Sequence, residues 1–335
     1  MPPPPPGYAA AILTELDELR SALAERAAEH YGRPVEIDNP RPLLGGSSRE
    51  LWAFDVLVEA ERHPLVLRRD PPGVEDPGAR AREAQALAAA GRHGVPVPAL
   101  LWTEEDGGMV MQRLEGEAIA RRILRDARYE TARGRLVDEV ARAAAATHSV
   151  SLDEVPAVPR PERDVGEAAI AGLESELDRI GEPHPALELG LRWLRAHLPA
   201  PVEPGLVHGD FRLGNFLVDE SGLVGVLDWE LCHAGDPAED LGWLCIRSWR
   251  FGADDRPVAG CGSRDELLEA YAAAGGRELS REELRFWEVL GNVRWGVICL
   301  VQADIHLSGA RRSLEHAAIG RRTCEPEWDA LAMID

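Results

Sequence analysis

The hydrophobic pattern of this sequence changes near Gly116, and this change limits the possible folds more than any other feature. Before Gly116, short apolar runs are separated by glycine and proline, a pattern typical of strands and turns. After it, apolar residues recur at the three- and four-residue spacing of amphipathic helices. At roughly 150 residues each, the 335 residues make about two domains or lobes. We therefore expect an α+β fold with a small β-rich N-lobe and a larger helical C-lobe.

The chain begins with a proline tail at 1–7 that we expect to be disordered. The boundary between the two lobes is expected at residue 116. The N-lobe then covers 8–115 and contains a five-stranded sheet, and the C-lobe covers 116–335. The elements expected in the N-lobe are a helix over 8–30, strands on both sides of a glycine loop at 45–48, a strand over 65–68, a helix over 79–90, and strands over 95–103 and 109–112. Those expected in the C-lobe are helices over 135–150, 168–180 and 187–198, strands over 206–208, 215–218 and 223–227, and further helices from 237 onward.

The segment most informative about chemistry reads Val-His-Gly-Asp-Phe-Arg-Leu-Gly-Asn at 207–215, and Val-Leu-Asp-Trp-Glu follows at 226–230. A carboxylate, an amide five residues later and a second carboxylate at a strand end suit phosphoryl transfer. In that reaction one carboxylate accepts the proton of the attacking hydroxyl. The amide and the other carboxylate hold Mg²⁺ against the nucleotide phosphates. Oxygen ligands favour such a hard cation, whereas a zinc site would call for more histidine and cysteine.

Three linked motifs occur in order: HGDxxxxN from 208, DWE at 228–230 and GDPxxDLG at 235–242. Together they resemble the aminoglycoside phosphotransferase and choline kinase superfamily, relatives of the protein kinases. Within it, the chain is most similar to phosphotransferase domains related to those fused to acyl-CoA dehydrogenases. The resemblance covers 43–242 and implies a bilobal protein-kinase-like fold. It also implies ATP and Mg²⁺ as cofactors and a small hydroxylated molecule as the phosphate acceptor.

The same resemblance assigns roles around the catalytic loop. Asp210 matches the catalytic base, and Asn215 and Asp228 match metal ligands. Glu230 would assist through a second metal or through water. Arg212 stands where protein kinases carry a lysine two residues after the base. It would either touch the transferring γ-phosphate as a catalytic group or pair with a nearby carboxylate.

Two further residues of these motifs, His208 and Asp240, are expected to brace the loop rather than react. His208 is expected to form hydrogen bonds to backbone groups.

The N-lobe supplies the matching nucleotide site. Arg68 ends a strand where kinases have a phosphate-binding lysine, and Glu83, fifteen residues later on the expected helix, would pair with it. Val66 lies on the same face of that strand and would roof the adenine. The expected phosphate-covering loop, which alone would also fit an ordinary hairpin turn, comprises Gly45, Gly46, Ser47 and Ser48. The stretch that resembles the adenine-reading hinge includes Gln112, Arg113 and Leu114, and the side chains of Arg113 and Arg69 are expected to be solvent or rim charges.

Composition matters at one point: all 37 basic residues are arginine, and there is no lysine. This excludes a Schiff-base lysine, a P-loop lysine and a lysine general base. Phosphate must therefore be bound by arginine or by backbone amides. Two functions remain open, an ATP- and Mg²⁺-dependent phosphotransferase and a nucleotide-binding pseudo-kinase without transferase activity.

Charge and cysteine usage bear on partners and compartment. The formal net charge of −21 argues against nucleic acid as a partner. The proline run at 1–7 lacks the features of a signal peptide, and the apolar run at 297–301 is too short to span a membrane. The five cysteines form no CxxC pair, which is typical of reduced thiols in a cytoplasmic protein.

The identity of the acceptor stays open at this level. An aminoglycoside, a choline-like cation and a hydroxyacyl thioester are all compatible with the motifs, and the oligomeric state and the choice between ATP and GTP are undetermined. Five aromatic residues of the C-lobe would form either a cation-binding cage or ordinary core: Trp243, Trp249, Phe251, Trp287 and Trp295.

Overall fold

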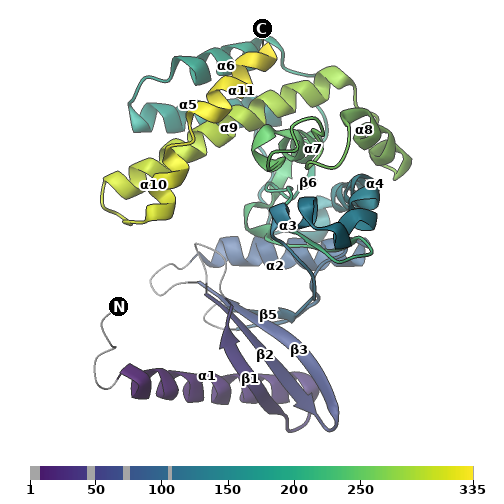
Figure 1. Ribbon diagram of the computed structural model, residues 1–335, viewed down its shortest axis with the longest axis vertical. Helices are drawn as coiled ribbons and strands as arrows, with labels where there is room; N and C mark the ends of the chain where they lie inside the picture. The colour runs from purple at the N-terminus through teal and green to yellow at the C-terminus, as the bar shows by residue number, and fades with distance from the viewer. Residues whose placement is uncertain (1–7, 44–49, 71–75, 105–107, 335) are drawn as a thin grey trace. The chain divides into compact units, whose positions relative to one another are not determined.

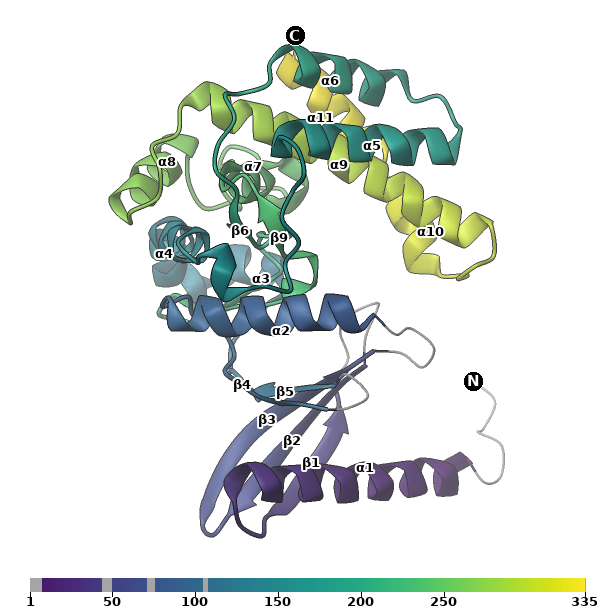
Figure 2. The same cartoon turned by 180° about the vertical axis from the view of Figure 1, so that it is seen from behind.

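The computed structural model of the protein describes residues 8–43, 50–70, 76–104 and 108–334, and its elements are shown in Figures 1 and 2. The chain divides into two compact units. The first holds the residues up to 84 together with 98–114, and the second holds 85–97 together with the residues from 115 onward.

An antiparallel sheet of five strands forms the centre of the first unit, in the order β1-β2-β3-β5-β4. Its strands are β1 (Glu36–Pro42), β2 (Glu50–Val58), β3 (Glu61–Arg69), β4 (Leu100–Thr103) and β5 (Met109–Gln112). β1 lies at an edge and contains two prolines, which have no N–H to donate and are tolerated there. Its register against β2 shifts between Asp38 and Arg41, so the edge carries a bulge.

One face of this sheet is covered by α1 (Tyr8–Tyr31), as Figure 1 shows. Leu19, Leu23 and Ala27 lie on one side of the helix and pack against buried side chains of the strands, among them Phe54 and Leu67. Because side chains alternate along a strand, burial of Leu65 and Leu67 against α1 leaves the next positions on the opposite face.

The strand expected over 95–103 is shorter than predicted, because β4 begins only at Leu100. Pro96 and Pro98 interrupt the earlier residues, and proline cannot donate to a strand ladder. The preceding helix α2 (Pro77–Arg92) extends the expected helix by two residues at each end.

The second unit is mostly helical. Its first helices are α3 (Ala120–Arg125), α4 (Glu130–His148), α5 (Val165–Ile180) and α6 (Pro185–Ala196). They are followed by α7 (Ala238–Cys245), α8 (Arg264–Ala273), α9 (Arg281–Leu307), α10 (Leu314–Gly320) and α11 (Cys324–Ile334). Sequence periodicity did not predict α3, whose six residues are too few to display a helical repeat.

Helix α9 organises the core of this unit, and Figure 2 shows α5, α6 and α11 beside it. Side chains from these helices form one buried cluster that includes Ile170, Leu191 and Trp287. Helix α7 approaches α9 closely at Gly242, where an added Cβ would lie 2.5 Å from atoms of Trp287. Only glycine fits this contact, which fixes α7 against the core.

Short strands hold the segment between α6 and α7. β6 (Gly205–Val207) pairs with β9 (His233–Gly235), and β7 (Phe216–Val218) pairs with β8 (Leu223–Val226). The single turn η3 (Trp229–Leu231) lies between β8 and β9. The sequence predicted β6, β7 and β8 but not β9, whose three residues carry no strand pattern of their own.

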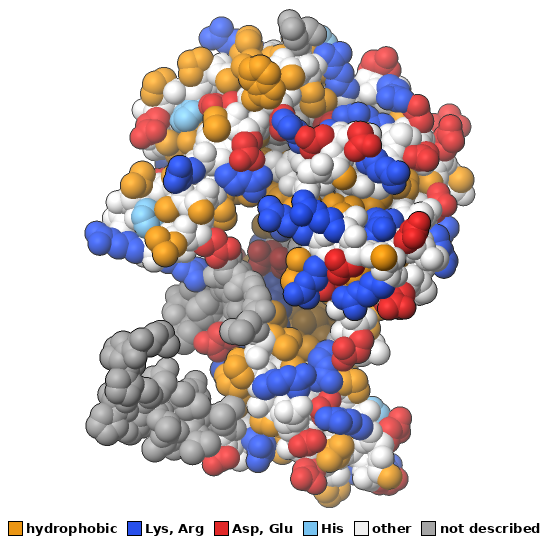
Figure 3. All heavy atoms as spheres, viewed as in Figure 1, with side chains coloured by type: hydrophobic (Ala, Val, Ile, Leu, Met, Phe, Trp, Pro, Cys, Tyr) orange, Lys and Arg blue, Asp and Glu red, His pale blue; other side chains and the backbone are white. Residues whose placement is uncertain are grey.

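The polar surface is mixed rather than single-signed on the face shown in Figure 3, where arginine and acidic side chains alternate over the helical unit. Four of the five free cysteines are buried and Cys324 is exposed. Across the described parts of the chain, no helix combines the length and apolarity needed to cross a bilayer.

Candidate active site

The loop from His208 to Asn215 connects β6 to β7 and carries the predicted base. Phe211 and Leu213 are fully buried and anchor the loop, so the side chains that alternate with them, Asp210 and Arg212, are partly exposed. At Gly209 the backbone has φ +79°, and an added Cβ would collide with the carbonyl of Leu231. Glycine is therefore required immediately before Asp210.

The start of the loop is tied to α7 by Asp240, which is fully buried. Its carboxylate accepts hydrogen bonds from the backbone N–H of His208 at 2.8 Å and of Gly209 at 2.9 Å. His148 of α4 lies 3.1 Å from the same carboxylate and 2.8 Å from the Tyr271 hydroxyl. Burial alone would raise the pKa of Asp240, but the His148 contact and the backbone donors hold that pKa below its ordinary value. Asp240 is thus the brace that the motif predicted.

The carboxylate of Asp210 has three donor side chains around it. The Arg212 Nε lies 2.9 Å from Oδ1 and 3.1 Å from Oδ2. The Asn215 amide donates to Oδ2 at 2.6 Å, and the Trp243 indole donates to Oδ1 at 2.8 Å. The base predicted from sequence therefore lies in a fixed polar setting, held by two groups of its own loop and one group of α7.

His208 links this loop to the segment that carries Asp228. Its Nδ1 accepts from the N–H of Asp210 at 3.2 Å, so its Nε2 donates to the carbonyl of Leu227 at 2.9 Å. The N–H of Leu227 in turn donates to the carbonyl of Asn215 at 2.8 Å. His208 thus bonds to backbone groups, as the sequence predicted.

The bond from Leu227 to Asn215 places the backbone of one predicted metal ligand, Asn215, beside the residue that precedes the other, Asp228. Asp228 follows directly, is exposed, and adopts a left-handed conformation with φ +65°. This conformation is uncommon outside glycine and often marks a functional position. Glu230 is half-buried in η3. The donor set of amide and carboxylate oxygens fits a hard cation such as Mg²⁺.

Arg212 adopts one of the two arrangements left open by the sequence, since its guanidinium pairs with a carboxylate, that of Asp210. Its Cζ also lies 4.5 Å from the ring centroid of Trp249. That ring packs against Trp243 and Trp295, with centroid distances of 5.3 Å and 4.9 Å. These indoles are buried and form core. Arginines of the chain itself lie over the faces of Trp249, Trp243 and Trp295. Trp287 and the partly buried Phe251 also pack in hydrophobic clusters, so the five aromatic residues form core.

Sequence reasoning missed a second brace, formed by Arg294 of α9. Its guanidinium donates to the carbonyl of Gly209 at 3.0 Å and to Glu239 at 2.7 Å. His233 lies 3.1 Å from the same carboxylate. Burial opposes charge on His233, yet Glu239 raises the pKa of this histidine. No sequence signal linked Arg294 to the loop, because 85 residues separate it from Gly209.

In the first unit, the expected ion pair between Arg68 and Glu83 is present. Arg68 lies on β3, opposite Leu51 of β2 and Met109 of β5. The Glu83 side chain is only 2% exposed and that of Arg68 is 11% exposed, so the pair is largely removed from water. Val66 and Arg68 occupy the face of β3 away from α1, as strand alternation predicted.

Two backbone N–H groups of the predicted hinge already donate hydrogen bonds within the first unit. The N–H of Gln112 donates to the carbonyl of Ala99, and that of Arg113 donates to the carbonyl of Pro64, each at 2.9 Å. These two N–H groups are therefore committed within the unit, and a nucleotide would have to use other backbone groups of the stretch, which ends at Leu114.

The side chain of Arg113 is not the rim charge that was predicted. It bonds to the fully buried Asp55 at 3.1 Å, and Arg69 pairs with Glu50 at 3.0 Å. The predicted phosphate-covering residues Gly45, Gly46, Ser47 and Ser48 lie outside the described residues.

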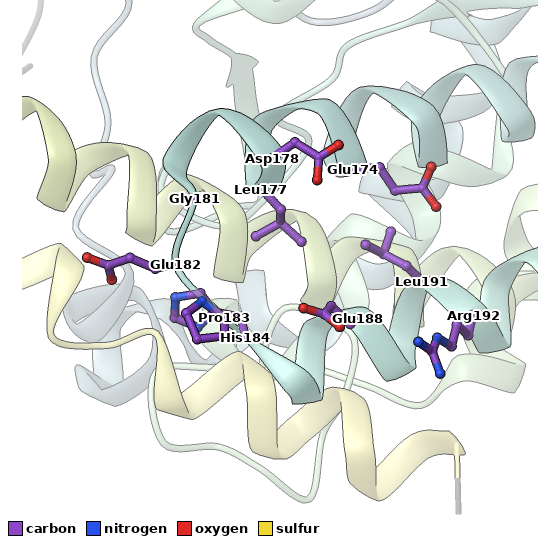
Figure 4. Close-up of a pocket in the computed structure, with 10 residues that line it drawn as sticks. All are labelled: Glu174, Leu177, Asp178, Gly181, Glu182, Pro183, His184, Glu188, Leu191 and Arg192. Atoms are coloured by element: carbon purple, nitrogen blue, oxygen red, sulfur yellow. The ribbon is translucent and has the colours of Figure 1, made fainter.

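A separate pocket of about 440 Å³ lies along α5 and α6. Figure 4 shows its acidic side chains: Glu174 and Asp178 come from α5, Glu188 from α6, and Glu182 from the segment between the two helices. It contains no residue of the catalytic loop, and we do not count it with the candidate active site.

The family of the chain follows from comparison with known proteins. A model of the phosphotransferase enzyme family matches residues 41–287, which is most of the chain. The chain belongs to the phosphotransferase enzyme family. This confirms the resemblance drawn from the three motifs and the expectation of an enzyme that transfers phosphoryl groups.

This phosphotransferase is similar to part of a longer curated protein. It is 31% identical over 208 residues to acyl-CoA dehydrogenase family member 10 of Mus musculus. The match covers 54% of this chain but only 18% of the mouse protein. The chain therefore corresponds to a small portion of that relative.

Solved structures confirm the α+β kinase-like fold of this phosphotransferase. A putative aminoglycoside phosphotransferase of Ralstonia eutropha JMP134 has a TM-score of 0.75 at 22% identity, covering 94% of this chain and 97% of its own. A thermostable mutant of aminoglycoside phosphotransferase APH(4)-Ia, in a ternary complex with ADP and hygromycin B, has a TM-score of 0.60 at 17% identity. That match covers 93% of this chain and 98% of the other.

Proposed function

We propose that this phosphotransferase moves the γ-phosphoryl group of ATP, with Mg²⁺, to a hydroxyl of a small molecule. The arrangement of Asp210, Asn215 and Asp228 carries the proposal. The Asn215 side chain donates to Asp210, and the Asn215 carbonyl accepts from the N–H of Leu227, the residue before Asp228. One short network thus links a candidate base to two candidate oxygen ligands, which is the set that phosphoryl transfer to a hydroxyl requires.

Asp210 is the proposed proton acceptor. Its carboxylate offers about four lone-pair positions. Trp243 occupies one lone pair of Oδ1, and Asn215 occupies one lone pair of Oδ2. The Arg212 Nε lies near the remaining lone pair of each oxygen. A hydroxyl bound at Asp210 therefore takes the place that Arg212 occupies here, which frees the guanidinium to contact phosphate oxygens. Both arrangements considered for Arg212 then belong to one catalytic cycle.

Asn215 and Asp228 are the proposed metal ligands, and Glu230 is a proposed helper through a second metal or water. The Asn215 Nδ2 is used by Asp210, so the opposite atom of the amide, its oxygen, is the one suited to a cation. When bound, Mg²⁺ neutralises the charge of the nucleotide phosphates. The residues of the chain hold the reactants in place, and positioning of this kind supplies much of the rate of phosphoryl transfer.

In the first unit, Arg68 is the proposed phosphate contact, oriented by Glu83. Similarity to a phosphotransferase crystallised with ADP supports nucleotide binding. The proposed nucleotide site also includes the glycine loop at 45–48 and backbone groups of the stretch at 112–114. Replacement of the family's lysine by arginine keeps the positive charge, and the planar guanidinium can bond to the carboxylate and to phosphate oxygens at once.

The proposed acceptor is a small hydroxylated metabolite. Structural neighbours include an enzyme bound to hygromycin B, and a curated relative is an acyl-CoA dehydrogenase family member. An aminoglycoside, a choline-like compound and a hydroxyacyl thioester are therefore the three classes to test. We propose a cytoplasmic location and no nucleic-acid or membrane partner, on the basis of the acidic charge and the reduced cysteines.

The test measures nucleotide consumption with Mg²⁺–ATP and a panel of these three acceptor classes. The Asp210→Ala variant should lose roughly 10²–10⁴-fold in kcat, the range that a positioned general base contributes. Chelation of Mg²⁺ should abolish turnover of the wild type. Equal turnover by the wild type and Asp210→Ala would refute the assignment of the base.

One observation favours a second function, a nucleotide-binding pseudo-kinase: the position of the family's lysine is taken by Arg68. Under this alternative Mg²⁺–ATP binds, as calorimetry would detect, but no hydroxyl in the panel is phosphorylated. Asp210-dependent transfer to any acceptor excludes it.

A further inference from the structure

The indole N–H of Trp243 donates a hydrogen bond to a side chain, unlike the other buried indole N–H groups of the C-terminal helices. Trp243 is 3% exposed, and its Nε1 donates to the Asp210 Oδ1 at 2.8 Å. The N–H groups of Trp249, Trp287 and Trp295 are also buried, but they have no hydrogen-bond partner among the described residues. The bond from Trp243 is therefore a specific feature rather than a general property of buried tryptophan here.

This bond complements the one from Asn215. The Asn215 amide reaches Oδ2 at 2.6 Å, so each oxygen of the Asp210 carboxylate has its own donor. A carboxylate rotates readily about its last side-chain bond, because that torsion is broad and roughly two-fold. Donors on both oxygens fix the plane of the group. They also decide which lone pairs remain for the hydroxyl of an acceptor.

Trp243 is itself held firmly. It lies on α7, directly after Gly242, where the helix touches Trp287 of α9 too closely for any other residue. Arg294 lies over its ring, with the Cζ 4.9 Å from the centroid, and also donates to the carbonyl of Gly209. The same contacts therefore fix the indole and the backbone next to the base.

We propose that Trp243 is a positioning residue, whose N–H orients the carboxylate of Asp210 toward the acceptor hydroxyl. The role rests on the proposed function, because it presupposes that Asp210 is the base. Loss of the N–H should lower kcat and leave the KM for ATP unchanged, since the indole acts on the base and not on the nucleotide. A small misplacement of a reacting group can cost up to about 10²-fold in rate.

The experiment compares Trp243→Phe with Trp287→Phe. Both substitutions shrink a buried indole to a phenyl ring, but only the first removes a hydrogen bond to Asp210. With Mg²⁺–ATP and the acceptor panel, Trp243→Phe should lose about tenfold or more in kcat, with the KM for ATP within about twofold of the wild type. Trp287→Phe should keep kcat within about twofold, and thermal unfolding of both variants reports any general loss of stability. Equal kcat in the two variants overturns the proposal.

A second measurement does not depend on turnover. In a ¹⁵N-correlated NMR spectrum, the Trp243 indole N–H is identified by its absence in Trp243→Phe, or by its contacts to the Trp249 ring if that variant does not fold. Asp210→Asn should shift this resonance and leave that of Trp287 in place. An unmoved Trp243 resonance refutes the contact.

The kinetics of the Asp210 and Trp243 variants distinguish failure of the proposed function from failure of the positioning role. A wild type without Asp210-dependent transfer removes the proposed function, and the positioning role with it, even if the resonance moves. Asp210-dependent transfer that Trp243→Phe leaves intact removes only the positioning role.

Discussion

The two arginines that we propose in place of the lysines of kinase relatives each have a carboxylate partner in their own unit. Arg68 pairs with Glu83, and Arg212 pairs with Asp210 and lies over the ring of Trp249. A guanidinium has five N–H donors in a plane, so Arg68 can keep Glu83 and still bind phosphate oxygens, whereas in the proposed cycle Arg212 exchanges Asp210 for phosphate. A chain without lysine can therefore retain both cationic positions of the kinase-like site.

Substitution of Arg68 tests the phosphate contact. Arg68→Ala should raise the KM for ATP at least about tenfold, since a charge-assisted hydrogen bond contributes roughly 1.5–3 kcal/mol. It also leaves Glu83 buried without its partner, which should lower the free energy of unfolding by about 3–5 kcal/mol. Arg68→Lys keeps the charge and should retain most of the affinity for nucleotide. Steady-state kinetics and denaturant unfolding measure the two effects.

The control is Arg128→Ala, because the Arg128 side chain is 52% exposed. If Arg68→Ala and Arg128→Ala give the same KM for ATP, Arg68 is not the phosphate contact.

At the scale of elements, the loop from His208 to Asn215 depends on helices that follow it in the chain. Asp240 of α7 accepts from the first two N–H groups of the loop, and Arg294 of α9 donates to the carbonyl of Gly209. The loop itself contains no regular structure that would fix it. Its geometry is therefore set by α7 and α9, which in turn meet at Gly242.

Removal of the Asp240 charge should change the pH dependence of stability. The pKa of Asp240 lies below its ordinary value of 3.8, because the donors around it outweigh its burial. A carboxyl of this kind stabilises the folded state above its unfolded pKa, and the contribution is lost as the pH falls through the folded pKa. Asp240→Asn should thus cost roughly 3 kcal/mol in the free energy of unfolding at neutral pH. The deficit should shrink once the pH falls below about 4.

Denaturant unfolding between pH 7 and pH 3 measures this difference, with Asp153→Asn as the control. The Asp153 side chain is 90% exposed in a surface pair with Arg160, so its loss should cost less than about 1 kcal/mol. A deficit of Asp240→Asn that does not change with pH would contradict the prediction.

The whole molecule has two compact units, and each carries residues that we propose for nucleotide or metal binding. A ligand that binds only the folded state raises its stability by mass action. Mg²⁺–ATP at 100 times its dissociation constant should add about 2.7 kcal/mol and raise the unfolding temperature by several degrees. Differential scanning fluorimetry with ATP, with and without a chelator, measures the shift. A shift that is the same without Mg²⁺ would argue against Asn215 and Asp228 as metal ligands.

Much of the fold and of the candidate site was predictable from sequence, because local patterns encode them. Helical periodicity indicated α1, α4 and α5, and alternation along β3 indicated the face that carries Arg68. Short elements such as α3 and β9 were missed, since a few residues cannot display a period. The side chain of Arg113 was misjudged and the contacts of the hinge backbone were not foreseen, because the partners Asp55, Pro64 and Ala99 come from β2, β3 and the residue before β4.

The sequence by itself determined the family, the α+β class and the identity of the groups proposed for chemistry, because motif order and spacing are properties of the chain alone. Only the tertiary structure decided how those groups are held. Trp243 meets Asp210 across 33 residues, and Arg294 meets Gly209 across 85. Contacts at such separations arise from helix packing around α7 and α9, and no local pattern specifies them.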